Sequence, residues 1–162
     1  MKKIFSYIFI FLITGCNSID SPEQIWEQVK NDRTQKDLQK AITNCNLILN
    51  EYPKHEFASK ALFQIGDIYL NDMSNYDFAI EFFNEVLEKY PLSKESEKAA
   101  FMIGYIYANN LDSYSDAEIS YTKFLELYPK SDLVQSVEYE LQVLEPLLKT
   151  IDSLNSIIEK EK

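Results

Sequence analysis

The sequence predicts an all-α protein, a right-handed solenoid of about three helix pairs with a 38-residue period and a C-terminal capping helix. Tyr-Pro pairs recur every 38 residues, at 52–53, 90–91 and 128–129. Residues 55–91 and 93–129 are identical at 14 of 37 positions, where average composition gives about two or three. Within each copy the apolar residues recur at helical spacing, so the repeating unit is a pair of helices.

The helical pattern divides the chain into eight elements and no strands. Helices are expected at residues 21–33, 35–51, 55–71, 75–89, 93–109, 113–127, 131–144 and 146–160. Ser21 is expected to cap the first helix, with Pro22 at its first position and Gln24 closing a capping box. Ser93 and Ser131 follow their Tyr-Pro pairs at the same distance and are expected to be caps of the same kind.

Pro146 is expected to break the last helical stretch, so that residues 146–160 fold back onto the solenoid. That stretch carries apolar residues at spacings of three and four: Leu144, Leu147, Ile151, Leu154 and Ile158. They suit a solenoid cap, or alternatively a helix that docks on a partner.

Gly66 and Gly104 occupy the same repeat position in mid-helix, where each costs about 1 kcal/mol relative to Ala. We expect a bulky neighbour to pack against each bare backbone. The other structural repeat positions are small or helix-ending residues: Ala79, Ala117, Pro53, Pro91 and Pro129.

The first twenty residues are typical of a targeting segment. Residues 1–15 join two lysines to an apolar run too short to span a bilayer, and are expected to be a cleaved lipoprotein signal peptide. Ile13-Thr14-Gly15-Cys16 resembles the lipobox of bacterial lipoproteins, in which the cysteine is acylated. Residues 16–20 are then a lipidated cysteine and a tether of about 14 Å, and residues 21–162 the helical domain.

Composition excludes several functions. The net charge is −10, and −12 once residues 1–15 are removed, so nucleic acid is not expected as a partner. No metal site and no cofactor are expected, because one His and two Cys cannot form a metal cluster. Cys45 shares its repeat position with Phe83 and Tyr121 and is expected to be buried, although a redox role is the alternative. His55 is expected to be structural.

Acidic side chains offer the remaining catalytic alternative. Glu85, Glu88, Glu95 and Glu97 could be imagined as acid and base pairs, but their positions favour a solvated helix face. We therefore expect no enzymatic activity, since no nucleophile, base and orienting group share related repeat positions.

The small and aromatic residues that recur at fixed positions resemble the tetratricopeptide repeat (TPR). They are Ala61-Leu62-Phe63, Ile65-Gly66, Tyr69, Ala79, Phe83 and Pro91, and then Ala99, Phe101, Ile103-Gly104, Tyr107, Ala117, Tyr121 and Pro129. The usual period of 34 is here 38. Long repeats downstream of a lipobox are similar to the BamD-like outer-membrane TPR lipoproteins and to the TPR part of YbgF-like proteins. The chain has room for fewer repeats than BamD, and lacks the coiled coil of YbgF.

This resemblance implies protein binding on the concave side, which the first helix of each pair lines. The expected binding residues, in repeat phase, are Lys60, Phe63, Asp67, Leu70, Asn71, Lys98, Phe101, Tyr105, Ala108, Asn109, Tyr139 and Val143. Phe63, Phe101 and Tyr139 would form an aromatic ladder suited to an extended peptide, unless the rings pack between helices.

The resemblance also implies a lipid-anchored scaffold at the bacterial outer membrane, facing the periplasm and holding envelope proteins together. Asn17 rather than Asp follows Cys16, and the lipoprotein sorting rule then indicates the outer membrane as the destination. The resemblance to the BamD-like group implies outer-membrane β-barrel assembly as the process. The alternatives are a periplasmic holdase or peptide receptor, and a Tol-Pal-associated envelope factor.

Overall fold

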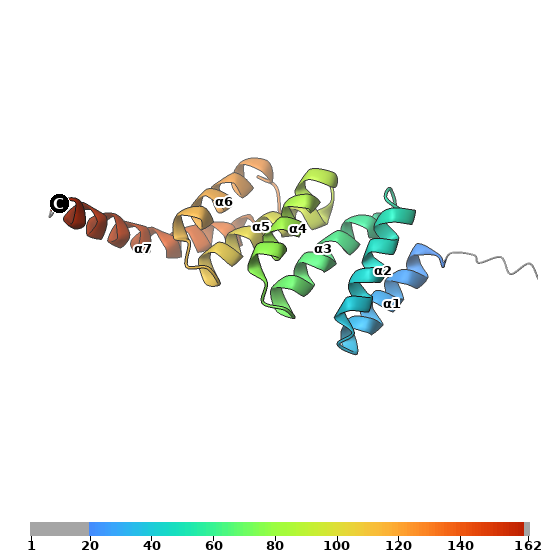
Figure 1. Cartoon of the computed structure of the whole chain (residues 1–162). Helices are drawn as coiled ribbons and strands as arrows, with labels where there is room; N and C mark the ends of the chain where they lie inside the picture. The colour runs from blue at the N-terminus through green and yellow to red at the C-terminus, as the bar shows by residue number, and fades with distance from the viewer. Residues whose placement is uncertain (1–19, 161–162) are drawn as a thin grey trace, which may run out of the picture.

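The computed structural model describes residues 20–160, which form seven α-helices and no strands. Their bounds are α1 Pro22–Thr34, α2 Leu38–Glu51, α3 Glu56–Asn71, α4 Tyr76–Lys89, α5 Lys94–Asn109, α6 Tyr114–Leu127 and α7 Val134–Lys160. The predicted all-α array of paired helices is confirmed. The two ends of the array are α1 and the last turns of α7, which extend beyond the other helices (Figure 1).

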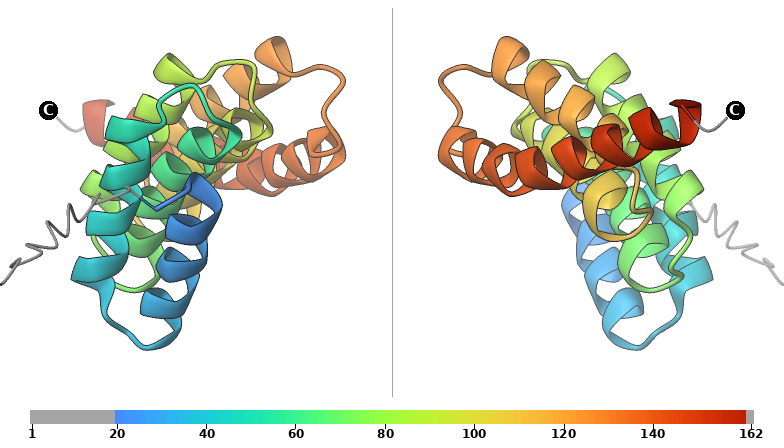
Figure 2. Two further views of the ribbon diagram at one scale, coloured as in Figure 1. Left: turned by 90° about the vertical axis from the view of Figure 1, so that its right-hand side faces the viewer. Right: turned by 90° about the vertical axis from the view of Figure 1, so that its left-hand side faces the viewer.

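Successive helices pack as antiparallel pairs, α1 with α2, α3 with α4 and α5 with α6 (Figure 2). The first helices of neighbouring pairs also touch, α1 with α3 and α3 with α5, whereas α2 and α4, like α4 and α6, make few or no contacts. Since the array is more closely packed on the side of the first helices, that side is the inner one. We call the surface formed by α1, α3, α5 and α7 the concave face.

The turn inside each pair repeats as regularly as the helices. Lys36, Ser74 and Asp112 lie 38 residues apart, and each has a positive φ, between 50° and 63°. Each directly precedes the residue that caps the second helix of its pair. The helix expected from residue 35 begins at Leu38, because Lys36 is in the left-handed region and a right-handed helix cannot include it.

Most of the predicted helix starts are confirmed. Ser21 and Gln24 form the expected capping box, and the Ser93 hydroxyl accepts the Ser96 N–H at 3.2 Å. Ser131 is not the cap of α7, which begins three residues later at Val134. Its hydroxyl instead accepts the Leu133 N–H and donates to Glu97 on α5.

The expected helix break at Pro146 is wrong, since α7 runs unbroken from Val134 to Lys160. Pro146 and Gln142 are both exposed, so water can hydrogen-bond the Gln142 carbonyl that loses its helical N–H donor. Val137 and Leu144 in the first part of α7 are buried against α6. The final turns do not fold back: Leu154, Ile157 and Ile158 remain more than half exposed.

Gly66 and Gly104 each lie under an aromatic ring from the partner helix. A Cβ on Gly66 would be 2.8 Å from Phe83, and one on Gly104 would be 2.5 Å from Tyr121. These rings are fully buried, as are Ala79 and Ala117 beside them. Pro53, Pro91 and Pro129 occupy the exposed turns that follow the second helices.

The first pair fills the same gap with other side chains. Its inner turn has three residues, 35–37, where the later turns have four, so α1 aligns with α3 at an offset of 37 residues. This offset places Val29 at the glycine position, while Cys45 occupies the position of the rings. Val29 and Cys45 are both buried in one cluster with Ile25 and Ile48. A larger residue on one helix is thus matched by a smaller one on the other.

Candidate functional site

The concave face carries one aromatic side chain in every layer. Phe63, Phe101 and Tyr139 follow each other at 38 residues, and the offset of 37 adds Trp26 from α1 as a fourth member. We call these four residues the aromatic row. The sequence prediction missed Trp26, because a strict 38-residue period does not align it with Phe63. The turn between α1 and α2 is one residue shorter than the later turns, so the correct offset is 37.

Three of the four rings in the aromatic row contact another aromatic ring. Trp26 stacks on Phe57 with ring centroids 5.6 Å apart, Phe63 leans on Phe83 at 5.1 Å, and Phe101 on Tyr121 at 5.9 Å. The first three rings are therefore partly buried between helices and partly open to the face. Within residues 20–160 no helix follows α7, and Tyr139 is 64% exposed.

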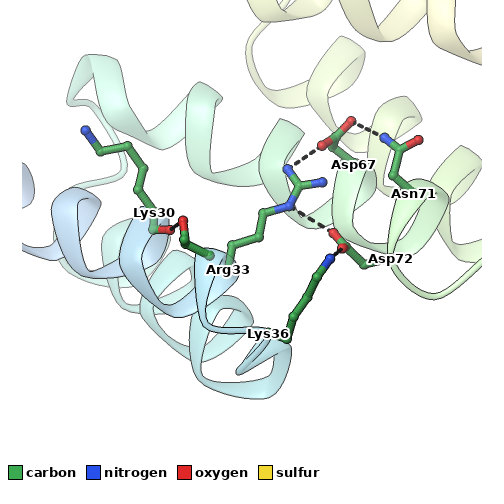
Figure 3. A network of polar contacts seen from close by, with 7 residues as sticks. Lys30, Arg33, Lys36, Asp67, Asn71 and Asp72 are labelled. Atoms are coloured by element: carbon green, nitrogen blue, oxygen red, sulfur yellow. Dashed lines mark hydrogen bonds and ion pairs between the residues drawn. The ribbon is translucent and has the colours of Figure 1, made fainter.

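The α1–α3 end of the concave face is covered by a charge network (Figure 3). The Arg33 guanidinium reaches Asp67 at 2.5 Å and Asp72 at 2.9 Å, and Lys36 reaches the second oxygen of Asp72 at 2.8 Å. The Asn71 amide donates to Asp67 at 2.7 Å. The hydrogen bond from Lys36, with that from Arg33, holds the pKa of the Asp72 carboxyl below its usual value despite some burial.

At the α5–α7 end of the concave face, apolar side chains occupy the repeat position that is charged on α3. Tyr105 and Val143 stand where α3 has Asp67, and they are 38% and 45% exposed. Beyond Tyr139 and Val143, the exposed stripe continues along α7 through Leu147 and Leu154. One face thus changes from charged at its first layers to apolar at its last.

The remaining predicted binding residues are placed as follows. Lys60 is half-buried, while Lys98 and Asn109 are exposed, and Asn109 donates to the Tyr105 carbonyl at 3.1 Å. Leu70 does not belong to the surface, because it is 5% exposed and packs in the core under α4 and α5. The side chain at this repeat position points into the core. The sequence prediction placed it on the surface because its neighbours on α3 are polar.

Two of the four glutamates are less solvated than expected. Glu95 accepts a hydrogen bond from the Ser59 hydroxyl at 3.0 Å, and Glu97 accepts one from Ser131 at 2.5 Å. Both are half-buried and tie neighbouring layers together. Glu85 forms a helical ion pair with Lys89 at the surface.

Cys45 and His55 have structural roles. Cys45 is fully buried, and this burial raises the pKa of its thiol to about 12, so the reactive thiolate is disfavoured. His55 caps α3, with Nδ1 accepting the Phe57 N–H at 3.3 Å and Nε2 lying 3.4 Å from Glu23. In residues 20–160, no group of three or more His, Cys, Asp or Glu side chains is placed to hold a metal ion.

Stacked helix pairs with an open face of aromatic, amide and charged side chains define a helical-repeat protein of the TPR kind, whose surface suits binding. More specifically, the chain belongs to the YfiO family, described as outer membrane lipoproteins. Residues 70–156, which are 87 of the 162, match this family. No match is found among curated proteins. None of the helices described is both long and apolar enough to cross a membrane.

Proposed function

We propose that this protein is a non-enzymatic, lipid-anchored scaffold on the periplasmic side of the outer membrane. Its concave face would hold envelope proteins together during outer-membrane β-barrel assembly. The observation that carries the proposal is the aromatic row, which runs through all four layers of a protein from an outer membrane lipoprotein family. Aromatic side chains that are anchored at their base and open at their edge are typical binding hot spots.

The proposed anchor is the acylated Cys16, which lies outside the described residues. Asp20 is fixed to the folded domain, since its carbonyl accepts the Tyr52 hydroxyl at 2.9 Å and its carboxylate accepts the Gln28 amide at 3.0 Å. Only Asn17, Ser18 and Ile19 then separate the proposed anchor from Asp20 in the sequence. A short tether of this kind would keep the α1–α2 end of the array close to the membrane.

The anchor can be tested with Cys16→Ala. This variant should accumulate as an uncleaved or mislocalised precursor with unchanged helical circular dichroism. Membrane fractionation and the mass of the N-terminal peptide measure the result. A variant that matures and stays in the membrane like the wild type would contradict the lipobox assignment.

The scaffold can be tested on residues whose replacement leaves the core intact. Tyr139→Ser with Val143→Ser removes exposed apolar surface from the concave face, and should abolish co-purification of envelope proteins from mildly solubilised membranes. Ile119→Ser with Leu92→Ser is the matched control, because these side chains are also exposed but lie elsewhere. Equal loss in both variants, or in neither, would overturn the proposed binding face.

A periplasmic holdase or peptide receptor is the second candidate function. It is supported by the open apolar stripe along α7, from Tyr139 to Ile158, which resembles a surface for transient capture of unfolded chains. The same purification separates the two: a scaffold yields stoichiometric partners, whereas a holdase yields many substoichiometric ones. A Tol-Pal-associated role would be recognised by the identity of the partners.

A further inference from the structure

Two hollows on the concave face meet at Gln64 and collect much of the positive charge of this acidic chain. The first is lined by Lys30, Arg33 and Lys36, together with Asp72. The second is lined by Trp26, Lys60, Phe63, Gln64, Glu95 and Lys98. Five of the thirteen Lys and Arg side chains in residues 20–160 line these hollows, in a chain of net charge −10.

The charges of the first hollow are already paired, whereas those of the second are more available. Arg33 and Lys36 are held by Asp72. In the second hollow, the Glu95 carboxylate keeps its charge but accepts a hydrogen bond from the Ser59 hydroxyl, and within residues 20–160 it forms no ion pair with Lys60 or Lys98. Lys60 has a loose ion pair at 3.5 Å with Glu56, and its ammonium lies 4.6 Å from the Phe57 ring centre. Lys60 and Lys98 can therefore turn to a bound anion.

The walls of the second hollow are aromatic. Trp26 on α1, stacked flat on Phe57, forms one wall, and Phe63 on α3 forms another. An apolar side chain could lie between these rings while a neighbouring charged one reaches the lysines. The hollow therefore matches alternating acidic and apolar side chains, as an extended chain presents them.

Gln64 stands between the hollows with an unused hydrogen-bonding group. Its Nε2 is buried and makes no hydrogen bond with the described residues. Such a group is unfavourable in the free protein. If the side-chain amide turned toward the hollow and paired with a bound peptide carbonyl, the penalty would be relieved. The same residue should therefore weaken stability and strengthen binding.

We propose that the hollow between α1, α3 and α5 binds an acidic segment of an extended protein chain. Its carboxylate lies between Lys60 and Lys98, an apolar neighbour contacts Trp26 and Phe63, and a backbone carbonyl pairs with Gln64. This assignment rests on the proposed function, because it names the chemistry of the partner that the concave face takes. Nucleic acid fits less well, since its long run of phosphates would meet the acidic remainder of the chain.

Trp26 is the single tryptophan of the chain, so its fluorescence reports binding at this place directly. The full-length protein in detergent is titrated with a blocked octapeptide that alternates aspartate and phenylalanine, and with the same peptide carrying asparagine. The aspartate peptide should shift the Trp26 emission and bind at least about tenfold more tightly, the usual value of one charged hydrogen bond. The preference should shrink in molar salt, which screens the lysine charges.

Three variants locate the effect. Lys60→Gln with Lys98→Gln should remove the preference for aspartate, whereas Lys123→Gln with Lys130→Gln, outside the hollow, should keep it. Gln64→Leu should lower the affinity for both peptides while thermal stability stays equal or rises, because an unpaired buried amide is lost. If Gln64 had only a structural role, Gln64→Leu would leave both affinities unchanged and lower the thermal stability.

The proposal is overturned if both peptides bind alike, or if the Lys60 and Lys98 variant retains the preference. Should the peptides fail while envelope proteins still co-purify through Tyr139 and Val143, the acidic site is wrong and the scaffold stands. Should co-purification fail as well, both are wrong.

Discussion

The first and third helix pairs of the array contain the same packing problem and solve it differently. In the third pair, Gly104 on α5 leaves room for the Tyr121 ring of α6. In the first pair, Val29 occupies the glycine position, Cys45 replaces the ring, and the turn between the helices is one residue shorter. The interior is therefore specified by the summed volume of two facing residues rather than by either residue alone.

The outward surfaces of these two pairs diverge further than their interiors. The first pair contributes Arg33, which joins Asp67 on α3 and Asp72 at the end of that helix. The third pair contributes the exposed Tyr105, and α7 after it carries the exposed Tyr139. Surface positions carry no shared volume constraint, so one repeat frame supports a charged end and an apolar end. The following predictions test the two pairs against each other.

The largest expected effect is that of Gly104→Leu, which should lower the free energy of unfolding by about 2–4 kcal/mol. A single Cβ would already lie 2.5 Å from the buried Tyr121 ring, which cannot move aside without separating α5 from α6. Chemical denaturation measures the change. Gln142→Leu is the matched control, since Gln142 holds the same repeat position in α7 but is exposed, and should change stability by less than about 0.5 kcal/mol. Equal losses would mean that the ring contact does not set the effect.

A double-mutant cycle tests whether Val29 and Cys45 in the first pair fill the space that Gly104 and Tyr121 fill in the third. Cys45→Phe should destabilise the protein by about 1–3 kcal/mol through overpacking, and Val29→Gly should destabilise it through lost packing and helix propensity. Together they recreate the glycine and ring of the other pairs, so the double variant should recover about 1–2 kcal/mol relative to the sum. Strict additivity of the two losses would show that Val29 and Cys45 do not face each other.

The repeat made most of the fold predictable from the sequence. The 38-residue period places helices α3 to α6 within one residue of their ends, because Tyr-Pro pairs and capping residues mark each boundary. Pro146 misled the prediction, since a proline on an exposed helix face leaves a carbonyl that water can satisfy. The spacing of apolar residues indicates which side chains are buried, but it does not indicate where a helix ends.

The interaction surface was less predictable for a different reason. Phe63, Phe101 and Tyr139 follow from the period, but Trp26 requires a one-residue shift in the first turn, which is visible only when Val29 and Cys45 are recognised as a matched pair. Glu95 was misplaced because its hydroxyl partner comes from the preceding repeat. Contacts between layers depend on which side chains of neighbouring repeats come within hydrogen-bonding distance. The residue pattern of a single helix does not show this.

Tyr121→Phe should produce a smaller change of opposite sign. The Tyr121 hydroxyl is buried and has no hydrogen-bond partner among the described residues, and burial raises the pKa of this phenol. Phe83 fills the same position in the second pair, so the variant should gain about 1 kcal/mol of unfolding free energy. Tyr128→Phe is the control with a paired hydroxyl, since that group bonds the buried Ser96 at 3.0 Å, and it should lose about 1 kcal/mol. A loss in both variants would indicate that Tyr121 is paired in solution.

The smallest expected effect distinguishes the two ends by pH. The pKa of Asp72 is held below its usual value by Lys36 and Arg33, so this carboxylate stabilises the folded state above the pKa of the unfolded chain, near 3.9. As the pH falls from about 5 through the folded pKa, that contribution is lost, because the unfolded state binds the proton more readily. Hydrogen exchange followed by mass spectrometry should therefore show α1 losing protection relative to α6 between about pH 5 and pH 2. The change should be modest, since water and salt screen a network at the surface.

Two variants control for this effect. Asp72→Asn should abolish the pH-dependent difference, because it lowers the protection of α1 already at neutral pH. Glu145→Gln removes an exposed helical ion pair from α7 and should leave α1 unaffected. If α1 and α6 lose protection together in the wild type, the charge network does not hold the first pair to the second.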